Sequence, residues 1–252
     1  MLAIERRREI IARLTADGKV LVSELAKEFG VTEETIRRDL ERLDKDGVAS
    51  KTYGGAVSKQ SAALDLPYNV RESVNVEQKQ QLAEKLAMLI RDGDRLMVDS
   101  SSTALYVIKR IKNKKNLTII TNSVKILLEL ADKQDWTVLS TGGVLKKGAL
   151  SLTGSSAEKM INSYQVDTAI CSCKGIDISL GITDSNENDC LIKQAMLSSA
   201  ERRILAVDGE KFDKKSFVKV CDVQQIDAIV TDCEPSEKWL SFCRDCDVDI
   251  VY

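Results

Sequence analysis

The chain has 252 residues, of which 43% are hydrophobic and 30% charged, and its formal net charge is −2 with a pI near 5.5. This length fits one large domain or a small domain followed by a medium one, and the balanced charge excludes a protein that holds a polyanion through its overall field. No apolar run reaches the ~18–20 residues that a membrane span needs, and residues 1–8 are charged and amphipathic, so we expect a cytoplasmic protein without a secretory signal.

Three short helical patterns occupy the first part of the chain. The apolar stripe of the first pattern consists of Ile4, Ile10, Ile11 and Leu14. The second pattern covers about residues 22–29, and Gly30 permits a left-handed turn after it. Thr32 is a good N-cap for the third helix, which buries Ile36, Leu40 and Leu43. With the small Ala26 at the crossing of two helices, these offsets predict a helix-turn-helix.

The third helix turns polar and basic side chains away from its apolar stripe, and arginine forks suit both phosphate oxygens and guanine edges. The segment 51–57, Lys-Thr-Tyr-Gly-Gly-Ala-Val, predicts a wing with a tight glycine turn. Residues 1–57 contain eleven basic and eleven acidic side chains, so the placement of the cations, not their number, favours DNA. The predicted DNA-binding residues are Thr32, Thr35, Arg37, Arg38, Arg42, Lys51, Tyr53 and Gly54. A plain helical bundle with solvated arginines and a module that binds protein are the alternatives.

Residues 58–75 are polar, irregular and contain Pro67, which predicts a linker between a DNA-binding domain at 1–57 and an α/β domain at 76–252. In the second domain apolar strands alternate with amphipathic helices, so we expect a mostly parallel sheet. The predicted strands are 96–98, 117–120, 137–139, 169–171, 204–207, 228–231 and 249–251. The predicted helices are 78–90, 104–111, 124–133, 156–162, 189–200 and 237–245.

Polar turns follow several of the predicted strands. A hydroxyl-rich turn that leads into a helix offers backbone N–H groups and a positive dipole end, which suit a phosphate. Because ligands of parallel sheets bind at the carboxyl ends of the strands, these turns predict one crevice for a phosphorylated small molecule. The first three turns supply Asp99, Ser100, Ser101, Ser102, Thr103, Thr121, Asn122, Ser123, Gly142 and Gly143. Later positions that could add cations or hydrogen bonds are Lys174, Gly175, Asp177, Lys193 and Lys211, although each lysine alone is more typical of a solvated surface.

Seven cysteines, an odd number, lie between positions 171 and 246 and predict free thiols rather than a disulfide framework. Cys243 and Cys246 have CxxC spacing, but a structural zinc site takes about four ligands and the chain has no histidine. We therefore expect no metal and no cofactor.

The chain resembles the DeoR family of bacterial regulators in Glu24-Leu25-Ala26, Val31, Thr35-Ile36-Arg37-Arg38-Asp39-Leu40 and Gly54-Gly55-Ala56. The resemblance extends along most of residues 76–252. It implies a winged helix-turn-helix followed by a larger α/β domain related in fold to ribose-5-phosphate isomerase and the CoA-transferases, and a repressor of sugar-metabolism genes that senses a phosphorylated sugar.

The chain departs from the family pattern at several positions. Tyr53 stands where histidine is common, and Ser101 stands where glycine is usual in the first polar turn. The other departures are Ser172, Lys174, Asp189 and Glu210. A side chain at position 101 narrows the approach of a phosphate to the backbone, so these positions bear on the choice of ligand.

The sequence therefore predicts a ligand-gated DNA-binding repressor that forms a homo-oligomer, because paired operator half-sites need paired reading heads. The alternative from another class is a sugar-phosphate isomerase or deaminase with a DNA-binding appendage. The absence of histidine and of an evident nucleophile–base pair argues against an enzyme, although Asp99, Asp177 and Asp184 are carboxylates that could act as bases.

Overall fold

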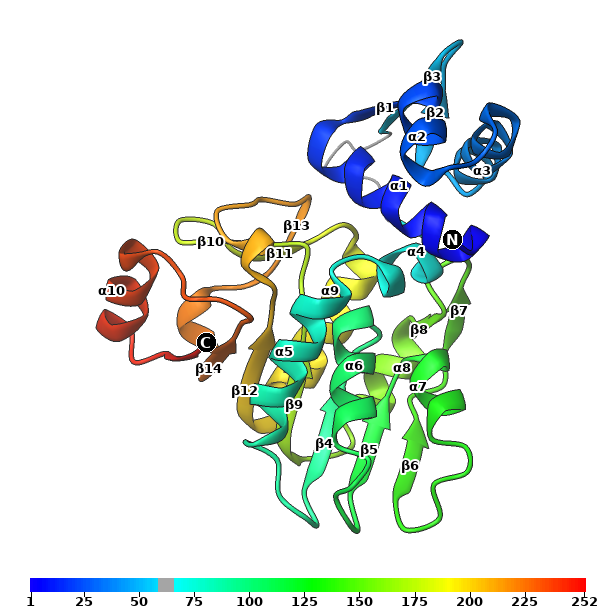
Figure 1. Ribbon diagram of the computed structural model, residues 1–252. Helices are drawn as coiled ribbons and strands as arrows, with labels where there is room; N and C mark the ends of the chain where they lie inside the picture. The colour runs from blue at the N-terminus through cyan, green and yellow to red at the C-terminus, as the bar shows by residue number, and fades with distance from the viewer. Residues whose placement is uncertain (59–65) are drawn as a thin grey trace. The chain divides into compact units, whose positions relative to one another are not determined.

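The structure, a computed structural model, describes residues 1–58 and 66–252 and divides into two compact units, Met1–Val74 and Asn75–Tyr252 (Figure 1). Part of the predicted linker, residues 59–65, lies outside the described residues. The rest of it is less irregular than expected, because residues 68–73 form a helix of the first unit. The Pro67 carbonyl accepts the first hydrogen bonds of that helix, from the N–H groups of Val70 and Arg71. Proline thus starts a helix here, a position for which its fixed φ is well suited.

Unit 1 has the order of a winged helix-turn-helix. Its elements are α1 (Ala3–Asp17), β1 (Lys19–Leu21), α2 (Val22–Phe29), α3 (Glu33–Lys45), β2 (Ala49–Lys51), β3 (Gly55–Ser58) and α4 (Tyr68–Ser73). The three strands form an antiparallel sheet in the order β1-β3-β2. Gly30 ends α2 with a φ of 64°, as the predicted left-handed turn requires.

One apolar cluster holds unit 1 together. Ile36, Leu40 and Leu43 of α3 are buried, as predicted, and they pack in one cluster with α1, α2 and Val70 of α4. The prediction for α1 is wrong at Ile4, which is 56% exposed. The other predicted members of the α1 stripe, Ile10, Ile11 and Leu14, are buried.

Unit 2 contains a seven-stranded parallel sheet in the order β15-β14-β12-β9-β4-β5-β6. Its strands are β4 (Arg95–Val98), β5 (Thr118–Thr121), β6 (Thr137–Ser140), β9 (Val166–Cys171), β12 (Ala200–Ala206), β14 (Ala228–Val230) and β15 (Asp249–Val251). Its helices are α5 (Val76–Ala87), α6 (Ser102–Arg110), α7 (Val124–Glu129), α8 (Ser155–Ile161), α9 (Glu187–Ser198) and α10 (Glu237–Asp245). Every predicted strand and helix is present, although α7 ends before the predicted residue 133 and Ala200 begins a strand.

The order of the strands reverses between β4 and β9. From β4 the chain adds β5 and β6 on one side, and it then returns to the other side of β4 to add β9, β12, β14 and β15. Right-handed crossovers in opposite directions place helices on opposite faces, and Figure 1 shows α5 and α6 in front of the sheet with α9 behind it. The carboxyl ends of β4 and β9 therefore flank a topological switch point, where open α/β sheets bind ligands.

Several short elements that the sequence did not predict lie between the strands of the large sheet along the chain. The hairpin β7 (Val144–Lys146) and β8 (Ser151–Thr153) follows β6. The strands β10 (Gly175–Asp177), β11 (Gly181–Asp184) and β13 (Val218–Cys221) form a separate antiparallel sheet after β9. Two single turns, η1 (Gly209–Lys211) and η2 (Val223–Gln225), complete the unit.

Candidate functional site

In unit 1 the face of α3 opposite its apolar stripe is exposed, and we call it the basic face for the three arginines that it carries beside acidic residues. Thr32 caps the helix by accepting the Thr35 N–H at 3.3 Å, and the two hydroxyls are 2.9 Å apart. Each arginine on this face pairs with a carboxylate one turn away on α3 or at its C-cap. The pairs are Arg37–Glu33 at 2.9 Å, Arg38–Glu34 at 3.3 Å and Arg42–Asp46 at 3.3 Å.

The predicted wing is the connection between β2 and β3. Lys51 at the end of β2 reaches back to Glu41 of α3 at 2.6 Å, and this hydrogen bond lowers the pKa of Glu41. Tyr53 at the tip is fully exposed, and the Gly54 carbonyl accepts the Val22 N–H at 2.9 Å. The wing and the basic face of α3 are therefore joined by a direct ion pair.

A buried ion pair that the sequence analysis missed sets the position of α3. Asp39, on the core side of α3, accepts a hydrogen bond at 2.5 Å from the buried Arg6 of α1, and Arg7 lies 3.5 Å from its other oxygen. The helical spacing of Asp39 from Ile36 and Leu43 places it on the apolar face, and this was the available signal.

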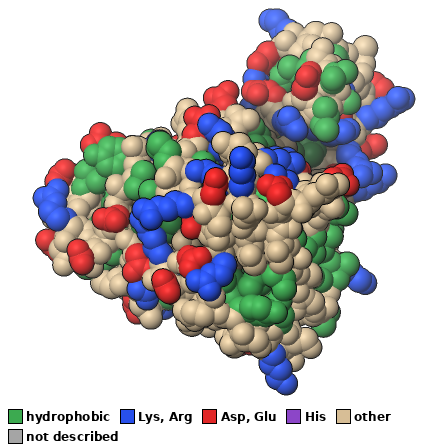
Figure 2. All heavy atoms as spheres, turned by 90° about the horizontal axis from the view of Figure 1, so that it is seen from below, with side chains coloured by type: hydrophobic (Ala, Val, Ile, Leu, Met, Phe, Trp, Pro, Cys, Tyr) green, Lys and Arg blue, Asp and Glu red, His purple; other side chains and the backbone are tan. Residues whose placement is uncertain are grey.

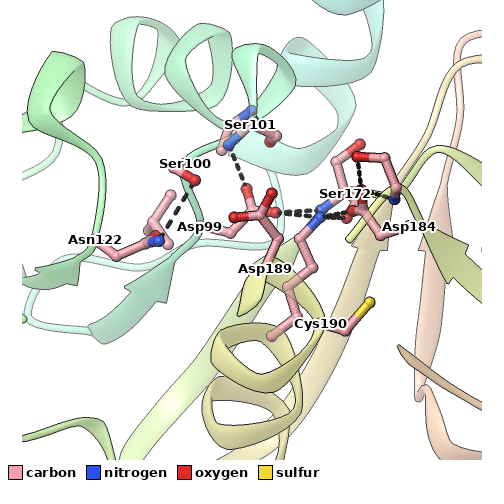
Figure 3. Close-up of polar contacts among 12 residues, drawn as sticks. Asp99, Ser100, Ser101, Asn122, Ser172, Asp184, Asp189 and Cys190 are labelled. Atoms are coloured by element: carbon pink, nitrogen blue, oxygen red, sulfur yellow. Dashed lines mark hydrogen bonds and ion pairs between the residues drawn. The ribbon is translucent and has the colours of Figure 1, made fainter. Parts of the chain in front are cut away.

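In unit 2 the side chain of Asp99, directly after β4, ties the two strands of the switch point together (Figure 3). One carboxylate oxygen accepts the Ser101 N–H and the other accepts the Ser172 N–H, both at 3.0 Å. Ser172 directly follows β9, and Asp99 is 1% exposed. The carboxylate thus connects the end of β9 to the start of α6.

Lys193 of α9 contacts the same point. Its Nζ donates to the Ser172 carbonyl at 2.6 Å and to the Asp184 carboxylate, and it lies 3.4 Å from Asp99. Burial favours the neutral form of each group, but the opposite charges outweigh it, so the pKa of Asp184 is lowered and that of Lys193 is raised. Because its contacts are within the protein, Lys193 acts here as a structural counter-ion to two buried carboxylates.

The first polar turn leads into α6 as predicted. Ser101 is the N-cap, and its hydroxyl accepts the Ala104 N–H at 3.0 Å. Ser102 and Thr103 are buried in the first turn, and their N–H groups have no acceptor among the described residues. These two amides and the helix dipole form an anion-binding arrangement.

The second and third polar turns lie at the ends of β5 and β6, beside the first turn. Thr121 donates to the Val98 carbonyl at 2.7 Å, and Ser123 caps α7. Asn122 is 2% exposed and donates to Ser100 Oγ at 3.4 Å. Gly142 and Gly143 are exposed, and a Cβ on Gly143 would lie 2.6 Å from the Thr153 carbonyl, so this glycine admits strand β8.

Of the later predicted residues, Lys193 joins this cluster through Asp99 and Ser172, and the others lie in the segments that follow β9. Gly175 lies in β10, where a Cβ would lie 2.4 Å from the Lys214 carbonyl. Asp177 closes the β10–β11 turn, and the Ser179 hydroxyl with two backbone N–H groups lowers its pKa to about 2. Lys174 pairs its N–H with the Thr183 carbonyl, and Lys211 ends η1.

Lys146 and Asp189 are joined to each other beside this cluster; the sequence pointed to Asp189 only as a departure from the family pattern and did not point to Lys146. Lys146 of β7 binds Asp189 of α9 at 2.8 Å, so the β7–β8 hairpin is joined to the helix that carries Lys193. Their signal was weak, because they are distant in sequence and each resembles an ordinary surface charge.

Within the described residues no group of three or more potential metal ligands is present, and no helix is long and apolar enough to cross a membrane. The seven cysteines form no disulfide, and burial raises the pKa of the Cys173 thiol to about 12.

Comparison with known proteins gives two family matches. The model of the DeoR-like helix-turn-helix domain matches residues 6–62, and that of the DeoR C terminal sensor domain matches residues 74–233.

Curated relatives match over most of the chain. A protein of Bacillus subtilis named uncharacterized HTH-type transcriptional regulator YulB is 39% identical, over 92% of this chain and 90% of its own. A putative aga operon transcriptional repressor of Escherichia coli O157:H7 is 32% identical, over 90% of this chain and 86% of its own. An L-fucose operon activator of Haemophilus influenzae is 30% identical, over 96% of this chain and 97% of its own. A solved ribose 5-phosphate isomerase of Methanocaldococcus jannaschii is similar in fold alone, with 17% identity and a TM-score of 0.41 over 56% of each chain.

Proposed function

The chain belongs to the DeoR family of transcription regulators, and we propose that it is a repressor that reads operator DNA with unit 1 and senses a phosphorylated sugar in unit 2. Helix α3 is the reading helix in this proposal, and the wing around Tyr53 contacts the backbone of the duplex. The DNA contacts come from the side chains predicted above, which the exposed face of α3 and the wing present together.

The observation that carries the sensor half of the proposal is the cluster of polar turns at the switch point of the sheet. The N–H groups of Ser102 and Thr103, at the N-terminus of α6, suit a phosphate group. The polar turn at the carboxyl end of β5 lies beside the turn that precedes α6. Lys193 is held by two carboxylates and a carbonyl. In this proposal it fixes the floor of the crevice, and backbone N–H groups hold the phosphate.

The relatives include regulators of both directions. One relative is named a repressor of the aga operon and another an activator of the L-fucose operon. Repression is the direction we propose, with effector binding lowering operator affinity. Self-association through unit 2 belongs to the same proposal, because a symmetric operator is bound by two DNA-binding domains. A cytoplasmic location is also part of the proposal.

The enzymatic alternative has less support. Both matching family models describe a regulator's domains, and the isomerase likeness is restricted to part of the fold. An isomerase or deaminase would also need a group that takes up and releases a proton. Lys193 and Asp184 hold each other in the charged state, as the directions of their pKa shifts indicate.

A thermal-shift screen tests the sensor proposal. Purified full-length protein is heated with phosphates of ribose, fructose and galactose, and with the unphosphorylated parent sugars. A ligand of the folded state at about 100 times its Kd adds about 2.7 kcal/mol of stability. We expect a shift with one phosphorylated sugar and none with its parent. Equal shifts with parent and phosphate, or no shift with any phosphate, would contradict the assignment.

A further inference from the structure

Three polar atoms near the crevice are buried and have no hydrogen-bond partner among the described residues: Asn122 Oδ1, Ser151 Oγ and Asp189 Oδ1. Asn122 and Ser151 are 2% and 1% exposed. We call these three residues the acceptor wall. Burying an unpaired polar atom is unfavourable, so each of these atoms needs an explanation.

The amide of Asn122 is fixed by both of its N–H groups. They donate to the Leu152 carbonyl at 3.0 Å and to Ser100 Oγ at 3.4 Å (Figure 3). Because both donors are on the nitrogen, the side-chain amide has one orientation, and its oxygen is left as an acceptor. Asn122 thus belongs to the same turn cluster as the N-terminus of α6.

The β7–β8 hairpin brings the other two atoms to the same side. Ser151 pairs directly with Lys146 across the hairpin, so their side chains lie on one face of it. The Lys146 ammonium reaches Asp189 on α9, and residue 151 also bridges to Ser123, the neighbour of Asn122. These contacts link the three members of the acceptor wall to one another through the β7–β8 hairpin.

Both hydrogen bonds to the Asp189 carboxylate go to one of its oxygens, and the other oxygen has no partner among the described residues. Lys146 and the Asn186 side-chain amide both bind Oδ2, at 2.8 Å and 2.6 Å. Oδ1 is therefore a buried acceptor on a charged group, for which a hydrogen bond is worth about twice a neutral one. Two of the three atoms, on Asn122 and Asp189, can only accept.

We propose that the acceptor wall binds carbon-bound hydroxyl groups of the effector, so that the effector is a phosphate ester with at least two free hydroxyl donors. This inference rests on the proposed sugar-phosphate function and adds which residues choose the sugar. The phosphate occupies the α6 N-terminus, and the hydroxyls face Asn122, Ser151 and Asp189. A deoxy analogue that leaves one of these acceptors unpaired binds more weakly than the parent compound.

The first test compares two serines whose hydroxyls are both buried and unpartnered. Ser216 donates its N–H to the Thr183 hydroxyl of β11 and is not a member of the acceptor wall. Ser151→Ala and Ser216→Ala should each leave the melting temperature unchanged or raise it, because each removes an unpaired polar atom. Ser151→Ala alone should raise the Kd of the best phosphorylated sugar from the screen, by about threefold to tenfold.

The second test reverses the polarity of one acceptor. In Asp189→Asn the remaining oxygen keeps the contacts with Lys146 and Asn186, and an N–H₂ group takes the place of Oδ1. We expect the Kd of the sugar phosphate to rise about tenfold to a hundredfold, because a hydrogen bond to a charged group is lost. The matched control is Asp227→Asn, which removes the same charge from an ion pair with Arg203 before β14, at the opposite end of the sheet.

Inorganic phosphate separates this inference from the function on which it rests. It has no carbon-bound hydroxyl, so its affinity, measured by calorimetry, should be the same in wild type, Ser151→Ala and Asp189→Asn. Sugar-phosphate binding that is equally strong in all variants overturns the acceptor wall and leaves the sensor function standing. A wild-type protein that binds no sugar phosphate overturns both.

Discussion

The arginines of α3 are exposed and already paired, and this arrangement determines how they can respond to DNA. Arg37 and Arg38 are 45% and 77% exposed in their side chains, with Glu33 and Glu34 one turn away. Exposed ion pairs of this kind contribute about 0.2–1 kcal/mol. Exchanging such a pair for a phosphate therefore costs little, while the nearby carboxylates weaken attraction to DNA of any sequence.

Replacing the two arginines should weaken DNA binding in proportion to the phosphates lost. In Arg37→Ala and Arg38→Ala the slope of log affinity against log salt should flatten by about 0.9 per lost contact. Glu33→Gln should change affinity in the opposite direction, because it removes a negative charge beside Arg37. Fluorescence anisotropy with labelled duplex DNA over a salt series measures both effects. Arg110→Ala, on α6 of unit 2, is the control and should leave the slope unchanged.

Asp184 and Lys193 give unit 2 a pH dependence with a definite sign. The folded pKa of Asp184 lies below its ordinary value, so the stability it contributes is present above its unfolded pKa and is lost as the pH falls through the folded pKa. The folded pKa of Lys193 is raised, so its contribution is complete below its unfolded pKa and is lost as the pH rises through the folded value. The stability that Asp184 and Lys193 contribute to unit 2 should therefore be fully present at neutral pH.

Breaking this buried pair should be costly. Asp184→Asn leaves Lys193 with less compensation, and we expect a loss of about 3–5 kcal/mol in the free energy of unfolding at neutral pH. The fall in stability below roughly pH 4 should also become shallower. Urea unfolding at several pH values measures both. Asp167→Asn, which breaks the partly exposed pair with Arg95, should cost less than about 1 kcal/mol. Equal losses of unfolding free energy in the two variants would show that the buried pair stabilises the protein no more than the partly exposed pair.

Among the elements, the wing depends on a close approach of two backbones. A Cβ on Gly55 would lie 1.9 Å from the Val20 carbonyl of β1, whereas a Cβ on Gly54 would meet no atom within 4 Å. The two neighbouring glycines thus have different reasons to be glycine, although the motif Gly54-Gly55-Ala56 does not distinguish them. Pairing of β1 with β3 needs the second of them.

Alanine at each position separates these roles. Gly55→Ala should destabilise unit 1 by about 1–3 kcal/mol through overpacking and should weaken DNA binding with it. Gly54→Ala should melt like the wild type, and its effect on DNA affinity should be small unless DNA approaches the backbone at this point. Circular dichroism melting and anisotropy provide the measurements. A Gly55→Ala protein with an unchanged melting temperature would contradict the assigned register.

The strands and helices that could be predicted from the sequence are those with a long apolar pattern. The strand around Ile170 is a short continuous apolar run, the stripe of Ile36, Leu40 and Leu43 has helical spacing, and the structure confirms both. The hairpin β7–β8 could not be predicted, because its strands have three residues each and Val144 and Leu145 are exposed. A short strand with one exposed face gives too few residues to establish a period of two.

The candidate site was predictable to the extent that it follows from chain order. Asp99, Ser101 and Asn122 stand at strand ends, and the parallel sheet brings strand ends together. The ion pairs between residues of different elements could not be predicted from chain order. Lys193 and Lys146 are two similar lysines in the sequence, but one is buried between carboxylates and the other joins a hairpin to a helix. Whether a lysine is free for a ligand depends on which carboxylates the fold places next to it.

At the scale of the whole molecule, charge is distributed evenly enough that DNA affinity must be local. Figure 2 shows Lys and Arg side chains interspersed with Asp and Glu over the face that it displays, and the net charge of the chain is −2. Each unit has its own apolar core. Regulation then requires that a ligand in unit 2 bind the free and the DNA-bound forms with different affinities.

This requirement gives a prediction that links the two units quantitatively. If the phosphorylated sugar lowers operator affinity by some factor, operator DNA must lower the affinity for that sugar by the same factor, and couplings of about 5- to 150-fold are typical. Anisotropy with a duplex selected by the protein from random-sequence DNA, with and without the sugar, measures the first factor. Calorimetry of the sugar with the free protein and with the operator complex measures the second. The double variant Arg37→Ala, Arg38→Ala is the control, because it should bind the sugar as tightly as the wild type whether or not operator DNA is added. A sugar that stabilises the protein but leaves operator affinity unchanged would be a ligand without a regulatory effect, and the proposed role as a sugar-responsive repressor would then be wrong.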